Sequence, residues 1–560
     1  MATQPISDVR AKPEAEASWL PMIVIALAQI LMIFNISSLQ VSIEGIVSSF
    51  GTPATTVGTA IVTYSLVVAG FIMLGARAGQ MFGSRRVFRI MVLIFGAAMA
   101  LMALSPAAVT MIIAQALAGA AAAALVPTLV VLIADNYRGS QQEKALGWLG
   151  GAQAMGIVLA FLISGALSTW IGWRYTFGFL VLLAALIYQL SGKLNDVKAR
   201  GIVSVDWIGV VLAASAILLI SVGANYINDW GFLLAGPRAP FSIVDMSPAP
   251  IMIVCGIFLG QGFFAWSRKR RAAGHTVLIA LEVVDRPSER SAVLSMFIIS
   301  ALGSAITFLV PLYIQIVQGR SGMQTAVAVI PFSLASFGAA VLVVRLYGQW
   351  SPRRITRYAF LVVAAGVGML GVVIRNDWNT FMVIVSMVLA GLGEGALVTL
   401  LFNVLVTASP KKMAGDVGSL RGTTNNLANG VGTAMAGALV VGVLGTGVHR
   451  ALVHNPVIPN ELKMEMNLDN IPFTSNAQLR RFLANSGRAT PEQVNEAERI
   501  NTEVRLMALK VSFFALAGLA LLAFFPAGGL PGYIRGELPR SNDEPSAQVR
   551  NKPVPMQRRE

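Results

Sequence analysis

Charged residues are scarce in this chain. They make up 12% of its 560 residues, whereas hydrophobic residues make up 55%. Soluble domains carry roughly 25% charged residues, so this composition excludes an ordinary soluble fold and indicates a membrane protein. Cysteine is scarcer still, with Cys255 as the single copy. One cysteine excludes an internal disulfide as a source of stability.

The usual signs of catalytic or nucleotide chemistry are also missing. The three histidines, His275, His449 and His454, lie outside the apolar runs and do not cluster like metal ligands. There is no Gly-x-x-x-x-Gly-Lys phosphate loop, which argues against an ATP-driven pump. We therefore predict that the protein is not an enzyme and has neither a cofactor nor a metal.

What the chain does have is long uncharged runs. A helix crosses the hydrocarbon core in about 20 residues, and thirteen runs are of this order or longer. The run at residues 90–134 is long enough for two crossings and breaks at Ser105-Pro106. The sequence therefore predicts an all-α polytopic membrane protein with about fourteen transmembrane helices and both termini on one side.

The positive charges follow the predicted topology. The chain has 42 Lys+Arg against 27 Asp+Glu, and most of them lie in short gaps between the runs. If the N-terminus is cytoplasmic, the arginine- and lysine-rich connections all fall on the cytoplasmic side, as the positive-inside rule requires. We therefore expect an inner-membrane protein with cytoplasmic termini, a lipid partner and no nucleic-acid partner.

One acid lies inside an apolar run. Glu394 is alone in the run at residues 378–410, about sixteen residues from its outer start, or about 24 Å at the helical rise. A carboxylate at this depth costs a few kcal/mol and is rarely kept without a use. We expect Glu394 to be a proton site or a counter-charge for a cationic substrate. The alternative is a protonated Glu394 hydrogen-bonded to a neighbouring helix.

Several uncharged polar residues are predicted to lie in the same membrane region. Each could line a substrate cavity, although for any one amide a hydrogen bond between helices is the simpler interpretation. These cavity candidates are Asn35, Gln40, Gln115, Tyr313, Gln315, Asn425 and Asn429. Glu44, near the outer end of the first run, is a weaker candidate because helix ends tolerate charge.

The second predicted span ends in a glycine-rich, basic segment. Its glycines allow close helix contact and a tight turn, and its arginines lie at the membrane surface. Asp416 and Arg421, near the inner surface later in the chain, are expected to form a charge cluster of a structural or gating kind. The predicted gate and loop residues are Gly75, Arg77, Gln80, Gly83, Arg85, Arg86, Asp416 and Arg421.

This segment, with its Gly-Ser-Arg-Arg-Val ending at Val87, resembles the loop signature of the major facilitator superfamily. Other segments agree in order and spacing: Val205-Asp-Trp-Ile-Gly, Pro311-Leu-Tyr-Ile-Gln-Ile-Val-Gln-Gly, Ala390-Gly-Leu-Gly-Glu-Gly and Gly172-Trp-Arg-Tyr-Thr-Phe. With the span count, the chain resembles the fourteen-span drug–proton antiporter family over roughly residues 23–444.

The resemblance implies a domain organisation. It predicts a cytoplasmic N-terminal segment at 1–18 and a six-helix bundle at 19–194. Two extra helices with a linker follow at 195–290, and a second six-helix bundle lies at 291–526. The second bundle includes a long outer loop at 449–506, where we expect helices at 475–484 and 490–507. The tail at 527–560 is expected to be cytoplasmic and largely disordered.

The sequence departs from the family pattern at four places. Where the first helix of the family usually carries an acid, this chain has the run from Asn35 to Gln40, and Gln115 replaces an arginine of the fourth helix. Gln80-Met81 replaces an Asp-Arg pair, and Ala160-Phe161 replaces a Gly-Pro pair. Each change removes a charge or a helix-bending residue. Proton coupling needs a titratable group. These changes therefore weaken the expectation of proton-driven antiport through the usual family residues, and they leave Glu394 as the candidate coupling group.

Three functions stay open at this point. The resemblance implies alternating access and proton-coupled efflux of amphipathic drugs or metabolites, as in multidrug resistance. A second hypothesis is a facilitator, or a carrier of lipids or anionic metabolites, without the usual proton coupling. A third is a non-transporting sensor or scaffold that acts through a partner at the outer loop 449–506.

Overall fold

The computed structural model describes residues 18–532, apart from 138, 196–205, 232, 237–238, 243, 274–285, 348, 377–379, 409–413, 454, 459–475, 477–478, 482 and 484–488. In this part of the chain the regular structure is helical, and one isolated bridge joins Leu234 to Met246. The predicted N-terminal segment 1–18 is described only at Ser18, and the predicted tail only as far as Gly532.

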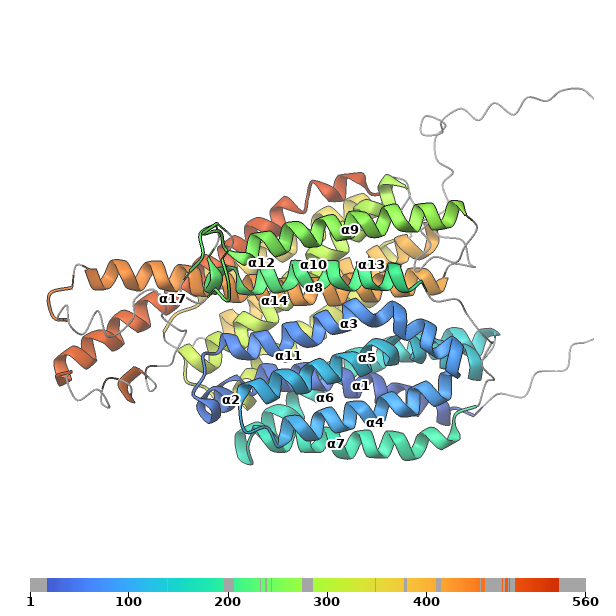
Figure 1. The fold of residues 1–560 in the computed structure, drawn as a ribbon, viewed down its shortest axis with the longest axis horizontal. Helices are drawn as coiled ribbons and strands as arrows, with labels where there is room; N and C mark the ends of the chain where they lie inside the picture. Colours follow the sequence, from blue (N-terminus) through green and yellow to red (C-terminus); the bar gives the residue numbers. More distant parts are fainter. Residues whose placement is uncertain are drawn as a thin grey trace, which may run out of the picture.

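Within these described residues, fourteen long helices run along one axis (Figure 1). They are α1 (Leu20–Val41), α3 (Thr55–Phe82), α4 (Ser84–Ala103), α5 (Ala108–Asn136), α6 (Gly139–Trp170), α7 (Trp173–Leu190), α8 (Trp207–Trp230), α9 (Pro248–Ala272), α10 (Pro287–Leu312), α11 (Gly322–Leu346), α12 (Pro352–Val373), α13 (Thr380–Ala408), α14 (Ala414–Val453) and α17 (Pro491–Leu522). Short elements are α2 (Ile43–Phe50), η1 (Ser191–Lys193), the π-helix η3 (Tyr313–Val317) and η6 (Pro526–Gly529).

The helix count agrees with the sequence. Thirteen of these helices are long and apolar enough to cross a membrane, and α6 has a shorter apolar part, Gly156–Trp170. The prediction of about fourteen transmembrane helices is therefore confirmed. Helices are the expected solution because lipid offers no hydrogen-bond partners, so the backbone must pair within each segment.

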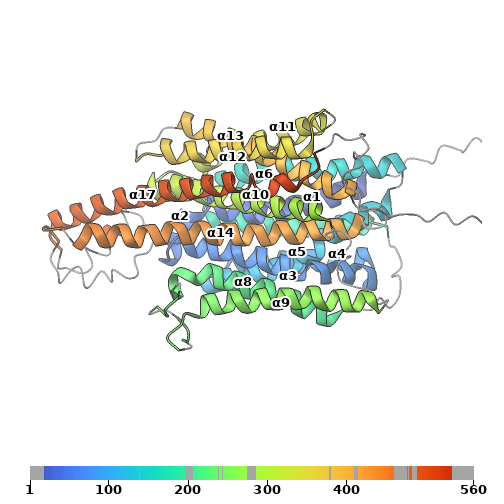
Figure 2. The ribbon, with the colours of Figure 1, turned by 90° about the horizontal axis from the view of Figure 1, so that it is seen from above.

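The helices pack in two groups. In the first, α3 and α4 pack on α5, α1 packs on α6, and α7 packs on α4. In the second, α11 and α12 pack on α13, α10 packs on α14, and α17 packs on α12 and α14. The groups meet where α3 packs on α14 and α6 on α11. The pair α8 and α9 lies at one side, where α8 contacts α3 and α14 (Figure 2).

The two ends of the helix stack differ. At one end α14 and α17 project beyond the other helices, which is the left side of Figure 1; we call this the hairpin end. At the opposite end α1 begins, and the part of the chain that the structure describes ends shortly after η6. There the Arg353 N–H donates to the carbonyl of Pro531 at 3.2 Å, which ties the start of α12 to the segment that follows η6. We call this the termini end.

Where the structure describes the predicted outer loop, the loop is mostly helix. α14 continues to Val453, and α17 begins at Pro491 and runs without a break into the last span. Thr490 caps α17: its hydroxyl accepts from the Gln493 N–H at 3.3 Å, and its own N–H donates to the Gln493 side chain at 2.9 Å. The predicted helix at 475–484 is described only at residues 476, 479–481 and 483, which are helical.

Candidate substrate cavity and gate

Glu394 lies at the centre of α13. It is the fifteenth of 29 residues in that helix, and its side chain is half-buried. The hydroxyl of Ser336 on α11 hydrogen-bonds to its carboxylate. Glu394 therefore lies at the middle of its helix, within the second helix group, and its depth in the bilayer stays a prediction.

The space for the carboxylate comes from a glycine on α10. A Cβ built at Gly303 would overlap Oε1 of Glu394, so only glycine leaves that position open. On α13 the neighbouring Gly395 lies against the backbone of Ser336, which brings α11 close to the acid. Glu394 on α13 thus lies against α10 and α11, two helices that precede α13 in the chain.

A polar seam joins α10 to α14. Ser300 donates to the side chain of Asn425 at 3.1 Å, and Ser304 donates to the carbonyl of Asn429 at 2.9 Å. The hydroxyls of Ser304 and Thr433 are 2.6 Å apart. Asn425 thus contacts α10 through its side chain, and Asn429, four residues later, through its backbone carbonyl. Since Gly303 lies between the two serines, the seam and Glu394 flank the same segment of α10.

A groove follows the seam toward the termini end. It has a volume of about 300 Å³ and is lined by residues of α10 and α14, among them Arg290, Phe297 and Leu427. The hydroxyl of Thr423, also in its lining, is buried without a hydrogen-bond partner. The groove gives the α10–α14 pair an open, largely apolar face next to the polar seam.

Arg421 lies one turn before Asn425 on α14. The residue is half-buried, and its guanidinium lies over the ring of Phe402 on α13, 4.2 Å from the ring centre. Asp416 lies within α14, but its side chain is outside the described part, so the expected Asp416–Arg421 cluster stays a prediction. The ring contact places a positive charge between α13 and α14.

Asn35 and Gln115 meet inside the first helix group. Asn35 on α1 donates to the Gln115 side chain at 2.7 Å, and Gln115 on α5 donates back at 3.0 Å. Both residues are fully buried. This is the interhelical hydrogen bond that we weighed against ligand contact for amides, and a role for either residue in a substrate cavity remains a prediction.

Gln315 joins the two helix groups at the hairpin end. Its amide donates to the carbonyl of Gln40 at 2.7 Å and accepts from the N–H of Glu44 at 3.0 Å. The N–H of Met323 donates to Thr169 at 3.0 Å in the same region. Gln40 and Gln315 are buried, and Gln315 bridges the break between α1 and α2.

Tyr313 forms hydrogen bonds with the backbone of Arg375, just after the end of α12. It is fully buried, and its hydroxyl donates to the carbonyl of Arg375 at 2.7 Å. The Arg375 N–H donates back to the Tyr313 hydroxyl at 3.2 Å. The side chain of Gln318 donates to the Tyr313 hydroxyl and to the Arg375 carbonyl. Tyr313 therefore anchors η3 within its own helix group.

The basic segment after α3 is held within the first helix group. Gly83 has a φ of 89° and separates α3 from α4, and Gly75 lies against the backbone of α5. Arg85 donates to the carbonyl of Gly192 at 2.9 Å, while Arg86 is exposed. Arg77 is half-buried and has polar or ring contacts of its own; the side chain of Gln80 lies outside the described part.

Several residues of the site carry no sequence signal strong enough to find them. Ser336 and Gly303 contact Glu394 from other helices, and Ser300 and Ser304 contact α14. Serine and glycine are common in membrane helices, so composition does not single them out. The spacing of Ser300 and Ser304, four residues apart in one span, places both on one helix face but does not distinguish them from other serines.

Known proteins resemble this chain along most of its length. Residues 25–433 match the sequence profile described as Major Facilitator Superfamily. A "Probable actinorhodin transporter" of Streptomyces coelicolor is 24% identical over 448 residues, which is 78% of this chain and 74% of that protein. The "Drug efflux pump JefA" of Mycobacterium tuberculosis is 22% identical over 507 residues, 88% of this chain and 94% of that protein.

A solved structure has the same fold. The crystal structure of a "peptide transporter POT in complex with sulfate" superposes with a TM-score of 0.59. It covers 90% of this chain and 93% of that chain at 13% sequence identity. At that identity the likeness shows a shared fold, which is the arrangement of the helices in two groups.

Proposed function

This chain belongs to the Major Facilitator Superfamily and is a membrane transporter rather than an enzyme, and from that membership we propose that it exports small amphipathic molecules by alternating access. The relatives support export, because several of them are named as efflux pumps or antibiotic export proteins. In alternating access, the two helix groups rock about a site near the bilayer midplane.

Glu394 is the observation that carries the proposal. It is a half-buried carboxylate at the centre of a membrane-spanning helix, and it lies against two other helices of the same group. We assign it the role of the coupling group, which exchanges a proton when a cationic or neutral amphiphile enters or leaves. The seam of Asn425 and Asn429 and the groove beside it offer hydrogen bonds and an apolar surface for such a substrate.

The contacts between the two helix groups at the hairpin end fit one stage of the alternating-access cycle. Gln315 joins the groups there, and Gly322 at the start of α11 lies against the carbonyl of Val41. A route between the groups at this end is therefore closed. With the positive-inside rule, the termini end faces the cytoplasm and the closed end faces outward.

A second function is favoured by one observation. The neutral pair of Asn35 and Gln115 occupies positions where the family resemblance implies an acid and an arginine. If coupling in relatives depends on those charges, this chain could work as a facilitator, or as a carrier of lipids or anionic metabolites, without a proton. The two functions differ in whether transport follows a pH gradient.

The experiment is transport in proteoliposomes with an imposed pH gradient. Purified wild type, Glu394→Gln and Glu394→Asp are compared with cationic, neutral and anionic amphiphiles added in turn. Glu492→Gln is the matched control, since it removes an exposed carboxylate from the first turn of α17.

Proton-coupled export predicts that a substrate triggers proton flux in wild type and in Glu492→Gln, and that Glu394→Gln loses it. Partial flux in Glu394→Asp would show that the carboxylate itself matters. Substrate movement without proton flux in wild type would support the facilitator. Absence of any flux across the whole panel would remove the transport proposal for these classes of substrate.

A further inference from the structure

Arg505 is a large, polar side chain in a fully buried position. It lies in the part of α17 near the hairpin end and is 1% exposed. Its guanidinium donates to three acceptors on different segments: the carbonyl of Asn501 at 3.2 Å, the side chain of Asn476 at 2.8 Å and the carbonyl of Ile316 at 3.2 Å. Because a guanidinium is planar with donors in a fixed fork, it fixes the mutual positions of the groups it binds.

Asn476 connects this arginine to the projecting hairpin. Its side chain donates to Thr502 at 2.8 Å and accepts from Asn501 at 2.8 Å, in addition to accepting from Arg505. The base of the hairpin is therefore one hydrogen-bonded unit.

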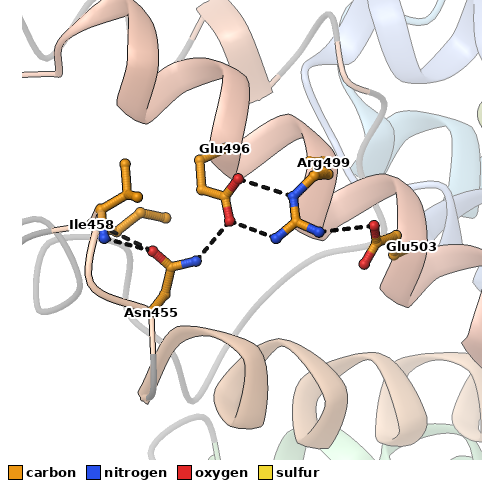
Figure 3. A network of polar contacts seen from close by, with 6 residues as sticks. Asn455, Ile458, Glu496, Arg499 and Glu503 are labelled. Atoms are coloured by element: carbon orange, nitrogen blue, oxygen red, sulfur yellow. Dashed lines mark hydrogen bonds and ion pairs between the residues drawn. The ribbon is translucent and has the colours of Figure 1, made fainter.

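Further out, the hairpin is braced by a separate network (Figure 3). Arg499 pairs with Glu496 at 2.7 Å and with Glu503 at 3.0 Å, and Asn455 donates to Glu496 at 2.7 Å. This network links the segment after α14 to α17.

Ile316 lies in the π-helical turn η3, directly after Gln315. A π-helical turn shifts the backbone pairing, and such turns occur mostly where function needs an irregular helix. Two of the contacts that hold this turn come from outside it: Arg505 donates to the Ile316 carbonyl, and the Tyr313 hydroxyl donates to the Arg375 carbonyl. The Gln315 amide then reaches across to α1 and α2.

We propose that Arg505 is a positioning residue for Gln315, so that the projecting hairpin sets how firmly the two helix groups are joined at the hairpin end. Arg505 holds the Ile316 carbonyl, and thereby the π-helical turn, in the place where Gln315 meets both Gln40 and Glu44. Loss of Arg505 weakens the closure without removing any group that bridges the two helix groups. This inference rests on the proposed alternating access, in which that closure must break and re-form.

The test measures opening directly and needs no transported substrate. Ser42→Cys, made in a Cys255→Ser background, places a thiol at a buried position between Gln40 and Glu44. Its rate of labelling by a membrane-impermeant maleimide reports opening at the hairpin end. Ser105→Cys is the control reporter, because Ser105 is equally buried in the α4–α5 connection inside the first helix group.

Each reporter is combined with Gln315→Leu, Arg505→Gln, both together, or Arg499→Gln. Loss of one hydrogen bond shifts an equilibrium by about fivefold, so Gln315→Leu and Arg505→Gln should each raise Ser42→Cys labelling by about that factor or more. The double variant should label no faster than Gln315→Leu alone, because Arg505 acts through Gln315. Arg499→Gln removes an arginine from the same helix and should leave labelling at the wild-type rate.

Three results would overturn the inference. One is an unchanged labelling rate in Arg505→Gln. Another is a double variant whose rate is the product of the two single effects, which would make the residues independent. The third is a parallel rise at Ser105→Cys, which would mean general loosening. If labelling behaves as expected but no substrate is transported, the positioning role stands and the transport proposal fails.

Discussion

Asn35 and Gln115 exchange two hydrogen bonds, at 2.7 and 3.0 Å, across the interface of α1 and α5. Both side chains are fully buried, and each satisfies a donor and an acceptor of the other. A neutral amide pair avoids the desolvation cost of two buried charges while keeping the same helices in register. The position that would hold charge in the family pattern is therefore a structural contact in this chain.

We predict that charging one member of this pair destabilises the protein. Asn35→Asp should lower the free energy of unfolding by about 3 kcal/mol at neutral pH, because it buries a carboxylate opposite an amide. Asn35→Asp combined with Gln115→Arg should recover most of that loss. Thermal unfolding of the purified protein in detergent measures both. Gln324→Glu, an exposed amide-to-acid change, should leave the melting temperature nearly unchanged. Equal stability of Asn35→Asp and wild type would refute this account.

A second prediction concerns the space beside Glu394. Gly303→Ala places a methyl group where Oε1 of Glu394 now lies, so the carboxylate must rotate away while the helices stay in place. Substrate-triggered proton flux should fall as in Glu394→Gln, with little change in melting temperature. Gly338→Ala is the control, because a Cβ there meets no atom within 4 Å. Undiminished flux in Gly303→Ala would show that the precise position of the carboxylate does not matter.

A third prediction concerns the start of α1. The Tyr137 hydroxyl accepts from the Met22 N–H at 2.9 Å and donates to the Ser18 carbonyl at 3.0 Å. Its ring stacks on Trp19, with the ring centres 5.4 Å apart. Tyr137→Phe keeps the ring but leaves both backbone groups without this partner. It should cost about 1 kcal/mol of stability, measured by thermal unfolding.

The effect of Tyr137→Phe should also depend on pH. Burial raises the pKa of the Tyr137 phenol above its usual value of 10.0, and the hydrogen bond from Met22 lowers it in part. A raised pKa favours the neutral form in the folded state, so its contribution is fully present below a pH of about 10 and is lost at higher pH. The stability difference between Tyr137→Phe and wild type should therefore be constant at neutral pH and shrink in strong alkali. A difference that grows with pH would contradict it.

The projecting hairpin shows which features of a helix the sequence predicts and which it does not. The Thr-Pro-Glu start at Thr490 predicts a helix there, and the structure has one, capped as the pattern requires. The sequence does not show that this helix continues into the last span, because a change from polar to apolar residues looks like a boundary. Backbone hydrogen bonding continues through such a change when neighbouring helices pack along both parts.

The sequence alone determined the helical spans, their number and the position of Glu394 at the middle of its span. Lipid forces the backbone to pair within each segment, so an apolar run of sufficient length has one regular solution. Only the tertiary structure decided which faces meet: Glu394 against Gly303 and Ser336, Asn35 against Gln115, and Gln315 against the break between α1 and α2. Those contacts join helices far apart in the chain, and they depend on how small and polar side chains fit between packed helices.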